Sequence, residues 1–275
     1  MTNQHALRSR ILVTGANGYI ASHVVDQLLG LGYMVRGTIR GSKPWLNQYF
    51  DQKYGSGCFE TVIVPSFEDM GVIESALDGI DPSFTCLIIR NQRQASDLTF
   101  GCDPNAVIPW VVQATLSILE IASRKPSIKR VVLVSSSSAT YPLTPDPAGR
   151  QLHSDIWNDA AVRAAWDDNT PLSERAVAVY AASKTEGERQ SWKWVESHRP
   201  HFEFNTVLPC FVVGKILHPE ILGSTMGSVR ELLQGDSTAF SKFPGQWYVD
   251  VEDTARLCAL GLLDDTVKSE RIFAF

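Results

Sequence analysis

Short apolar runs alternate along this chain with longer segments in which apolar residues recur every three or four positions. The first run, Ile11–Val13, is followed by a turn that contains glycine, and helical spacing begins directly after it. Gly32 ends this helix, and a second apolar run follows. The pattern therefore predicts a β-α-β unit over residues 11–40. The apolar positions of its helix are Ile20, Val24, Leu28 and Leu31.

The same alternation predicts further elements as far as residue 209. A loop is expected at the proline-rich stretch 141–150 and at the region after it, which carries Trp157 and Trp166. Strands that alternate with helices form a parallel sheet covered on both faces, so we predict an α/β, Rossmann-type doubly wound fold. The expected strands lie at 59–65, 84–89, 130–134 and 202–208, and the expected helices at 44–54, 68–77, 104–124 and 172–198.

Beyond Pro209 the alternation is looser. We expect a helix over 226–234 and a short extended stretch over 247–251. A helix capped by Asp253 should then run to Leu263, before a final strand over 271–275. This pattern suggests a Rossmann domain at 1–209 and a small region at 210–275, which is intertwined with the first and covers one side of a cleft.

The turn after the first strand has the small residues that a dinucleotide pyrophosphate requires. Gly15 permits a sharp turn, and Gly18 lets backbone N–H groups approach the phosphates at the positive end of the helix. Ala21 keeps helix and strand close together. An ordinary strand-to-helix turn is the alternative, but the flanking strand and helix favour dinucleotide binding. The candidate cofactor-binding residues here are Gly15, Asn17, Gly18, Tyr19 and Ile20.

The end of the second strand should lie beside the adenosine ribose, where an acidic residue usually holds a cofactor that lacks the 2′-phosphate. Here the strand ends in Arg40, and Lys43 follows. A guanidinium binds a phosphate through two parallel hydrogen bonds, and a nearby ammonium adds positive charge. This pair favours NADP (NADPH) over NAD, and the alternative is that both are solvated loop charges.

Tyr180 and Lys184 are spaced so that they project from one face of the helix expected at 172–198. The positive charge of the lysine would stabilise the phenolate and lower the pKa of the tyrosine. Such a tyrosine can donate a proton to a carbonyl oxygen while a hydride arrives from a nicotinamide. Tyr49 and Lys53 have the same spacing, but they follow the second strand, and we interpret them as a pair on a helix surface.

What favours the pair at 180–184 is its place after the serines Ser135–Ser138, which end the fifth strand. Ligands of open parallel sheets bind at the carboxyl ends of the strands. A serine hydroxyl there can hold a substrate oxygen as it gains negative charge.

Taken together, these motifs resemble the extended short-chain dehydrogenases/reductases. The resemblance extends over nearly the whole chain and includes Trp247–Thr254. The end of the second strand and the segment Leu208–Gly214 resemble, more narrowly, the dihydroflavonol reductases and the fungal NADPH-dependent aldehyde and ketone reductases of the methylglyoxal type. The ordered set Thr14–Ala21, Ser135–Ser137, Tyr180 and Lys184 is far more specific than any one motif.

The resemblance implies an NADP-dependent oxidoreductase that reduces a small or medium aldehyde or ketone. By it, Ser137 is the catalytic serine, with Ser136 as the nearest competitor, and Tyr180 is the proton donor. Lys184 would hold the nicotinamide ribose, and Arg40 the 2′-phosphate. The segment from Pro209 to Val212 would lie along the nicotinamide, and residues 210–275 would be the substrate-binding or lid region.

The chain departs from the family pattern at three places. An acidic residue expected after the third strand is replaced by Ser66-Phe67, the turn at residues 89–96 is longer and more polar, and the chain stops at its final strand. We therefore keep two alternatives, a catalytically weak NADP-binding regulator or defective relative, and a nucleotide-sugar epimerase or dehydratase. The aromatic residues Trp157, Trp166, Phe211 and Trp247 are candidates for an apolar pocket, but core packing is the commoner role for such residues.

Composition excludes several other classes of function. A net charge of −5 and the lack of a basic block argue against nucleic-acid binding. No apolar run is long enough for us to expect a membrane span, and the polar N-terminus does not resemble a signal peptide. The five cysteines include no C-x-x-C pair, which predicts reduced thiols in a cytoplasmic protein and no metal site. The partner expected is a small-molecule carbonyl substrate, and the chain is expected to be a monomer or homodimer.

Overall fold

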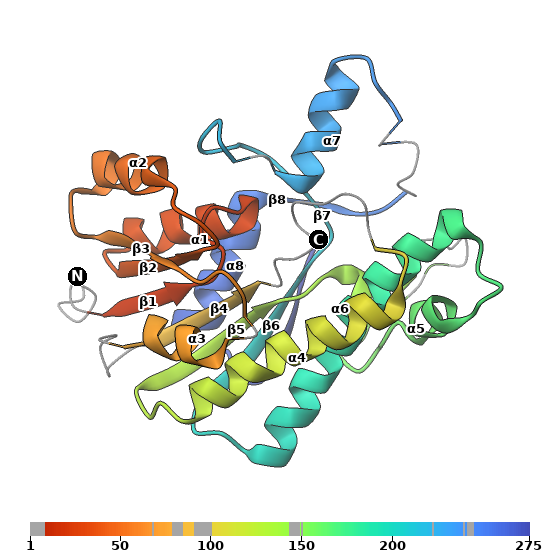
Figure 1. The fold of residues 1–275 in the computed structure, drawn as a ribbon, viewed down its shortest axis with the longest axis horizontal. Coiled ribbons are helices and arrows are strands. Elements are labelled where there is room, and N and C mark those ends of the chain that lie inside the picture. The colour runs from red at the N-terminus through yellow and green to blue at the C-terminus, as the bar shows by residue number, and fades with distance from the viewer. Residues whose placement is uncertain are drawn as a thin grey trace.

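The computed structural model describes residues 9–275 except 68, 79–84, 91–100, 143–148, 150, 222, 239 and 241–244. Its centre is a seven-stranded sheet in which every neighbouring pair is parallel, so the predicted doubly wound α/β fold is confirmed (Figure 1). The strand order is β3-β2-β1-β4-β5-β6-β9. The strands are β1 (Arg10–Val13), β2 (Met34–Ile39), β3 (Phe59–Ile63), β4 (Thr85–Arg90), β5 (Ile128–Val134), β6 (Glu203–Pro209) and β9 (Arg271–Ala274).

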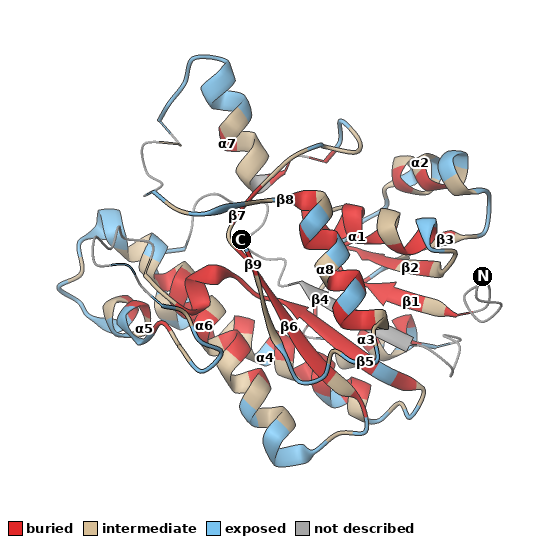
Figure 2. Ribbon diagram, turned by 180° about the vertical axis from the view of Figure 1, so that it is seen from behind, coloured by how far each residue is buried: buried red, intermediate tan, exposed pale blue. Residues whose placement is uncertain are grey.

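Helices cover both faces of this sheet, and alternate residues of β1 point to opposite faces. Ile11 and Val13 pack in one core with α1 (Tyr19–Gly30), α2 (Pro44–Tyr54) and α8 (Val251–Leu263). Leu12 packs in a second core, on the other face, with α3 (Met70–Ala76), α4 (Pro104–Ser123) and α6 (Leu172–His198). Figure 2 shows that buried residues follow the strands and the inner sides of these helices.

The segment after β6 leaves the sheet and then returns to it. A small second sheet pairs β7 (Phe211–Val213) with β8 (Tyr248–Asp250) in parallel, and α7 (Ser224–Leu233) projects beside it (Figure 1). The chain then re-enters the main layers through α8 and β9, which pairs with β6. Part of the region 210–275 therefore belongs to the main sheet layers, and the division into two domains stays a prediction.

Three details of the predicted helices are wrong. The loop expected around Trp166 contains a helix, α5 (Asp159–Trp166), because the Asn158 side chain accepts a hydrogen bond from the backbone N–H of Ala161 and starts it. Leu31 is 54% exposed, since it caps the C-terminus of α1 instead of belonging to its buried face. The cap of α8 is Asp250, whose carboxylate accepts from the N–H of Glu252, whereas Asp253 lies inside the first turn.

Within the described residues, one helix is long and apolar enough to cross a membrane by length and composition. This helix is α4, and half of the apolar window concerned is buried inside the protein. Its buried residues pack against α6 and the sheet. A helix in the core of an α/β fold can therefore meet the same criterion of length and apolar composition.

Candidate active site

Backbone hydrogen bonds hold the glycine turn after β1 against β2. The N–H of Gly15 donates to the Thr38 side-chain oxygen at 3.0 Å, and the N–H of Ala16 donates to the Thr38 carbonyl at 3.0 Å. Gly15 adopts a φ of 64°, a left-handed conformation that favours glycine. Gly37 allows this close approach, because a Cβ there would lie 2.5 Å from the Cβ of Ala16.

The N-terminus of α1 is suited to an anion. The helix begins at Tyr19, and its cap, Gly18, provides no side-chain oxygen for the first N–H groups. The first turn also has no acidic side chain, so within the described residues no carboxylate of this turn neutralises the positive end of the helix. Of the predicted cofactor-binding residues, Asn17 and Gly18 are partly exposed, whereas Gly15, Tyr19 and Ile20 are buried.

The side chain of Tyr19 contributes a buried polar atom with no partner among the described residues. Tyr19 is 3% exposed, and its hydroxyl has no hydrogen bond. Burial raises the pKa of this phenol above its ordinary value, and the charge of Asp250 raises it further. Buried polar groups in folded proteins nearly always have partners. A hydroxyl in this state beside a glycine turn fits a site that binds a polar ligand such as a dinucleotide.

The predicted 2′-phosphate residues lie just after the carboxyl end of β2. Arg40 is exposed and follows the last strand residue, while Lys43 is half-buried at the N-cap position of α2. Both cations thus follow the strand to which the glycine turn is hydrogen-bonded, at its carboxyl end. This arrangement is compatible with a phosphorylated ribose.

Tyr180 and Lys184 face each other on α6. The Lys184 Nζ atom lies 6.0 Å from the centre of the Tyr180 ring, and both side chains are half-buried. The helix lies against a short 3-10 helix, η2 (Ser137–Ala139), which begins with Ser137. The structure therefore brings together the elements that carry all three predicted catalytic residues.

The second copy of this spacing has different surroundings. The Lys53 ammonium lies 2.7 Å and 2.9 Å from the two carboxylate oxygens of Asp26 on α1, so it forms an ion pair across two helices. The Tyr49 ring packs edge-on against His218.

All the serines at the end of β5 are buried, but they have different partners. Ser135 donates to Glu188 at 2.7 Å. Ser136 accepts hydrogen bonds from both the N–H and the hydroxyl of Ser138 and thereby caps η2. Ser137 is the first residue of η2, and its carbonyl accepts from Thr140. The hydroxyls at 135, 136 and 138 therefore have structural roles inside the protein.

The sequence analysis missed three further side chains that hold this region. Glu188 lies one helical turn beyond Lys184, and its buried carboxylate forms an ion pair with Arg271 of β9 at 2.8 Å. Asn158 is also buried, and its amide donates to the carbonyl of Ser138 at 2.8 Å. The spacing of Glu188 from Lys184 was a visible signal in the sequence, whereas nothing local pointed to Asn158 or Arg271.

The expected nicotinamide-side segment follows β6. Pro209 ends that strand, in register with Ala274, and Val212 is buried in β7 with its carbonyl accepting from Thr225. Between them, Cys210 donates from Sγ to the Ala274 carbonyl, and burial raises the pKa of its thiol to about 11. Cys210 is therefore a neutral structural thiol at physiological pH.

The candidate aromatic residues have different surroundings. Phe211 is buried, as core packing predicts, and the Arg271 guanidinium lies 3.9 Å from the ring centre of Trp157. Trp247 is 65% exposed and Trp166 is 48% exposed, so the expectation of core packing is wrong for both. Of the departures from the family pattern, Phe67 is buried in the second core, and the turn after β4 lies outside the described residues from position 91.

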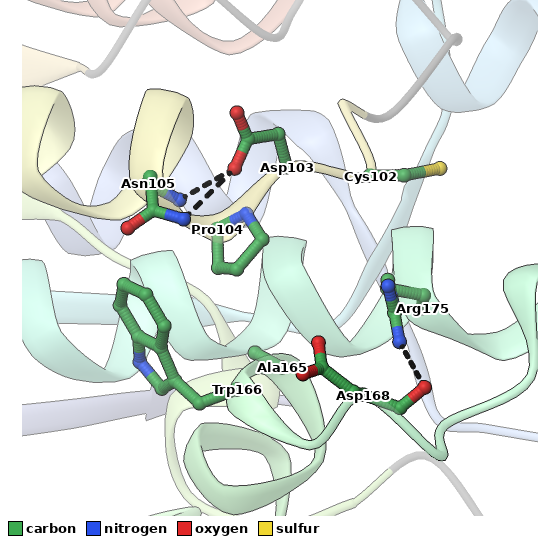
Figure 3. Close-up of a pocket in the computed structure, with 8 residues that line it drawn as sticks. All are labelled: Cys102, Asp103, Pro104, Asn105, Ala165, Trp166, Asp168 and Arg175. Atoms are coloured by element: carbon green, nitrogen blue, oxygen red, sulfur yellow. Dashed lines mark hydrogen bonds between the residues drawn. The ribbon is translucent and has the colours of Figure 1, made fainter.

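A cavity of about 370 Å³ lies between the N-terminus of α4 and the junction of α5 with α6 (Figure 3). Trp166 lines one side, and Arg175 lies on another, where it donates to the backbone carbonyl of Asp168 at 2.7 Å. No predicted catalytic or cofactor-binding residue is among its lining residues. Among the described side chains, no group of His, Cys, Asp and Glu is placed to hold a metal ion.

The parallel sheet, with the glycine turn and the serines at the carboxyl ends of its strands, defines a Rossmann-type protein. A family model, "NAD dependent epimerase/dehydratase family", matches residues 11–273, and the chain belongs to that family. The predicted resemblance to the extended short-chain dehydrogenases/reductases is thereby confirmed.

Individual relatives are similar over almost all of the chain. It is 45% identical to ketoreductase nvfG of Aspergillus novofumigatus, over 97% of this chain and 76% of that protein. It is 35% identical to aldehyde reductase 2 of Sporidiobolus salmonicolor, over 96% of this chain and 76% of that protein. The structure of Gre2 from Candida albicans in complex with NADPH has a TM-score of 0.78 at 22% identity, over 97% of this chain and 78% of that one. That last likeness concerns the fold.

Proposed function

We propose that this protein is an NADPH-dependent reductase of an aldehyde or ketone. The observation that carries the proposal is the pairing of Tyr180 and Lys184 on α6, against the 3-10 helix that begins with Ser137. The similarity to proteins named ketoreductase and aldehyde reductase supports it. The substrate class proposed is a small or medium carbonyl compound.

Tyr180 is the proton donor of this reaction. When bound, NADPH supplies a hydride to the carbonyl carbon. Tyr180 donates its phenolic proton to the carbonyl oxygen as that oxygen gains negative charge. The Lys184 ammonium, 6.0 Å from the phenol ring centre, stabilises the phenolate that is left behind. In the reverse direction, the phenolate accepts the proton of the alcohol.

Ser137 is assigned to hold the carbonyl oxygen. Its competitor, Ser136, already accepts two hydrogen bonds from Ser138, at 3.2 Å and 2.9 Å, so its oxygen is engaged in forming the turn. A donor that is fixed before the reaction stabilises developing charge without reorganising. The turn formed by Ser136 and Ser138 provides that fixed backbone for Ser137.

The residues present fit NADPH. The N-terminus of α1, with Gly15, Asn17, Gly18, Tyr19 and Ile20 around it, would hold the pyrophosphate. Arg40 and Lys43 would hold the 2′-phosphate, which explains two cations where a strict NAD enzyme has an acid. Pro209 and Val212 would lie along the nicotinamide, and Lys184 beside its ribose.

The test is a fluorescence titration of the purified protein with NADPH and NADH, followed by NADPH oxidation against a panel of aldehydes and ketones. We expect tight NADPH binding and turnover of at least one carbonyl. Tyr180→Phe should lower kcat by about a hundredfold or more, because general acid catalysis contributes on that order. Tyr49→Phe is the matched control, since Tyr49 precedes Lys53 at the same spacing, and it should retain wild-type kcat.

Other outcomes separate the alternatives. NADPH binding without turnover of any carbonyl would contradict the reductase and favour an NADP-binding regulator. A purified protein that retains NAD through gel filtration would favour an epimerase or dehydratase. Full activity in Tyr180→Phe would remove the tyrosine from the mechanism.

A further inference from the structure

Glu188 and Arg271 form an unusually buried ion pair. Their side chains are 1% and 6% exposed, and among the described residues no other ion pair has both partners more than nine-tenths buried. Arg271 Nε lies 2.8 Å from one carboxylate oxygen, and a terminal nitrogen of the guanidinium lies 3.4 Å from the other. A buried ion pair is weak support for stability, because desolvation offsets the attraction of the charges. The geometry that this pair imposes is therefore of more interest than its energy.

The carboxylate of Glu188 holds the serine turn from one side. Ser135 donates to Oε2 at 2.7 Å, and Thr206 of β6 donates to Oε1 at 2.8 Å. Ser135 lies directly after β5 and shortly before the catalytic candidate Ser137. The position of the strand end that leads into η2 is thus coupled to a side chain of α6.

Arg271 holds the same turn from the other side through the segment before α5. Its guanidinium donates to the carbonyls of Ser154 at 2.6 Å and Ile156 at 2.9 Å. That segment leads directly to Asn158. The Asn158 amide donates to the Ser138 carbonyl at 2.8 Å, and its backbone N–H donates to the Ala139 carbonyl at 3.0 Å. Both ends of the turn that contains Ser137 are therefore tied to one ion pair.

The third connection runs along α6. Tyr180, Lys184 and Glu188 are spaced by four residues each, so they project from one side of the helix. A carboxylate fixed by β5, β6 and β9 restricts both the rotation of α6 and its sliding along the sheet. It thereby restricts where the phenol and the ammonium lie.

We propose that Glu188, held by Arg271, is a positioning residue that sets the placement of Ser137 relative to Tyr180 and Lys184. This inference rests on the proposed reductase function. It assigns to these two residues a role in geometry and no contact with substrate or cofactor.

Ser135→Ala is the variant that tests this proposal most directly, because it removes one connection to Glu188 and leaves the ion pair intact. The matched control is Ser191→Ala. Ser191 is on α6 and fully buried, and its hydroxyl donates to the carbonyl of Gly187 in its own helix. Both variants lose one buried hydroxyl and one hydrogen bond, but the bond of Ser135 goes to a carboxylate, so the melting temperature of Ser135→Ala should fall further than that of Ser191→Ala.

We expect kcat of Ser135→Ala to fall by about tenfold or more, since displacements of about 1 Å in an active site can cost on the order of a hundredfold in rate. The dissociation constant of NADPH should change much less than kcat, because the glycine turn and Arg40 lie on other elements and only Lys184, among the proposed cofactor-binding residues, is on α6 next to the disturbed contact. Ser135→Thr, which keeps the hydroxyl, should recover most of the lost kcat. Ser191→Ala should keep wild-type kcat.

A second variant tests the ion pair itself. Glu188→Gln keeps the size of the side chain but removes its charge, and it should lower kcat at least as much as Ser135→Ala. If the Glu188→Gln variant does not fold, kcat is compared instead in the double variant Glu188→Gln with Arg271→Gln, which leaves no unpaired buried charge.

Several results would overturn the proposal. One is equal kcat in the wild type, Ser135→Ala and Ser191→Ala, and another is an equal loss of kcat in both alanine variants. A failure of the reductase function itself is distinguishable from these, because the wild type would then turn over no carbonyl, or Tyr180→Phe would remain active. Wild-type turnover that is lost in Tyr180→Phe and unchanged in Ser135→Ala would refute only the positioning role.

Discussion

Gly37 occupies a position where even one methyl group should disturb both stability and cofactor binding. In Gly37→Ala, the new Cβ would lie 2.5 Å from the Cβ of Ala16 and 2.9 Å from Cζ of Phe59. Carbon atoms in contact normally lie about 3.5–4.0 Å apart, so β2 and the glycine turn would have to separate by about 1 Å. The turn resists this movement, because the N–H groups of Gly15 and Ala16 are hydrogen-bonded to Thr38.

Overpacking of this kind costs about 1–3 kcal/mol, and we expect a value near the upper end because the nearest atom belongs to a hydrogen-bonded turn. For a domain of this size, about 3 kcal/mol corresponds to a fall of roughly 5 °C in Tm, from the typical unfolding entropy per residue. Scanning calorimetry measures this shift. An NADPH titration of the same protein should show weaker binding, because the displaced turn is the expected pyrophosphate site.

Gly41→Ala is the matched control, since Gly41 follows the same strand and a Cβ there meets nothing within 4 Å. Its Tm should stay within about 1 °C of the wild type, as for most surface substitutions. If Gly37→Ala had the same Tm as Gly41→Ala and bound NADPH as tightly as the wild type, the argument from close approach would be refuted.

Two other predictions concern His23 and Arg40. Burial lowers the pKa of His23 below 6.5, only partly offset by the Lys215 carbonyl, so the unfolded chain binds a proton more readily than the folded one. The neutral ring therefore contributes its full stability above about pH 6.5, and this contribution is lost as the pH falls toward the lowered pKa of His23 in the folded protein. The midpoint of urea unfolding should be lower at pH 5.5 than at pH 7.5, and the difference between the two midpoints should be smaller in His23→Gln. Arg40→Ala should weaken NADPH binding by about ten- to a hundredfold, the worth of a charge-assisted hydrogen bond, and leave NADH binding unchanged. An equal loss for both cofactors in the fluorescence titration would place Arg40 away from the 2′-phosphate.

Where the structural signal is local, the sequence predicted the elements well. The helices expected at 44–54 and 172–198 are α2 and α6 at the same bounds. Pro44 at the first helical position and the turn at Arg199, with its left-handed φ of 45°, mark ends that neighbouring residues determine. The α5 helix was missed because its start depends on Asn158, whose side chain satisfies the N–H of Ala161 while its amide donates to distant Ser138.

The sequence by itself determined the class of fold and the candidate chemistry. The spacing of apolar residues and the positions of glycine turns are local features of the sequence. They therefore specified the alternating strands and helices, the cofactor turn, and a tyrosine and lysine on one helix face. Only the tertiary structure decided what holds that face in place. Glu188 meets Ser135 at a separation of 53 residues and Arg271 at a separation of 83, and no local pattern encodes such pairs. The parallel sheet brings them together, because its strands are adjacent in space in an order that the chain does not follow.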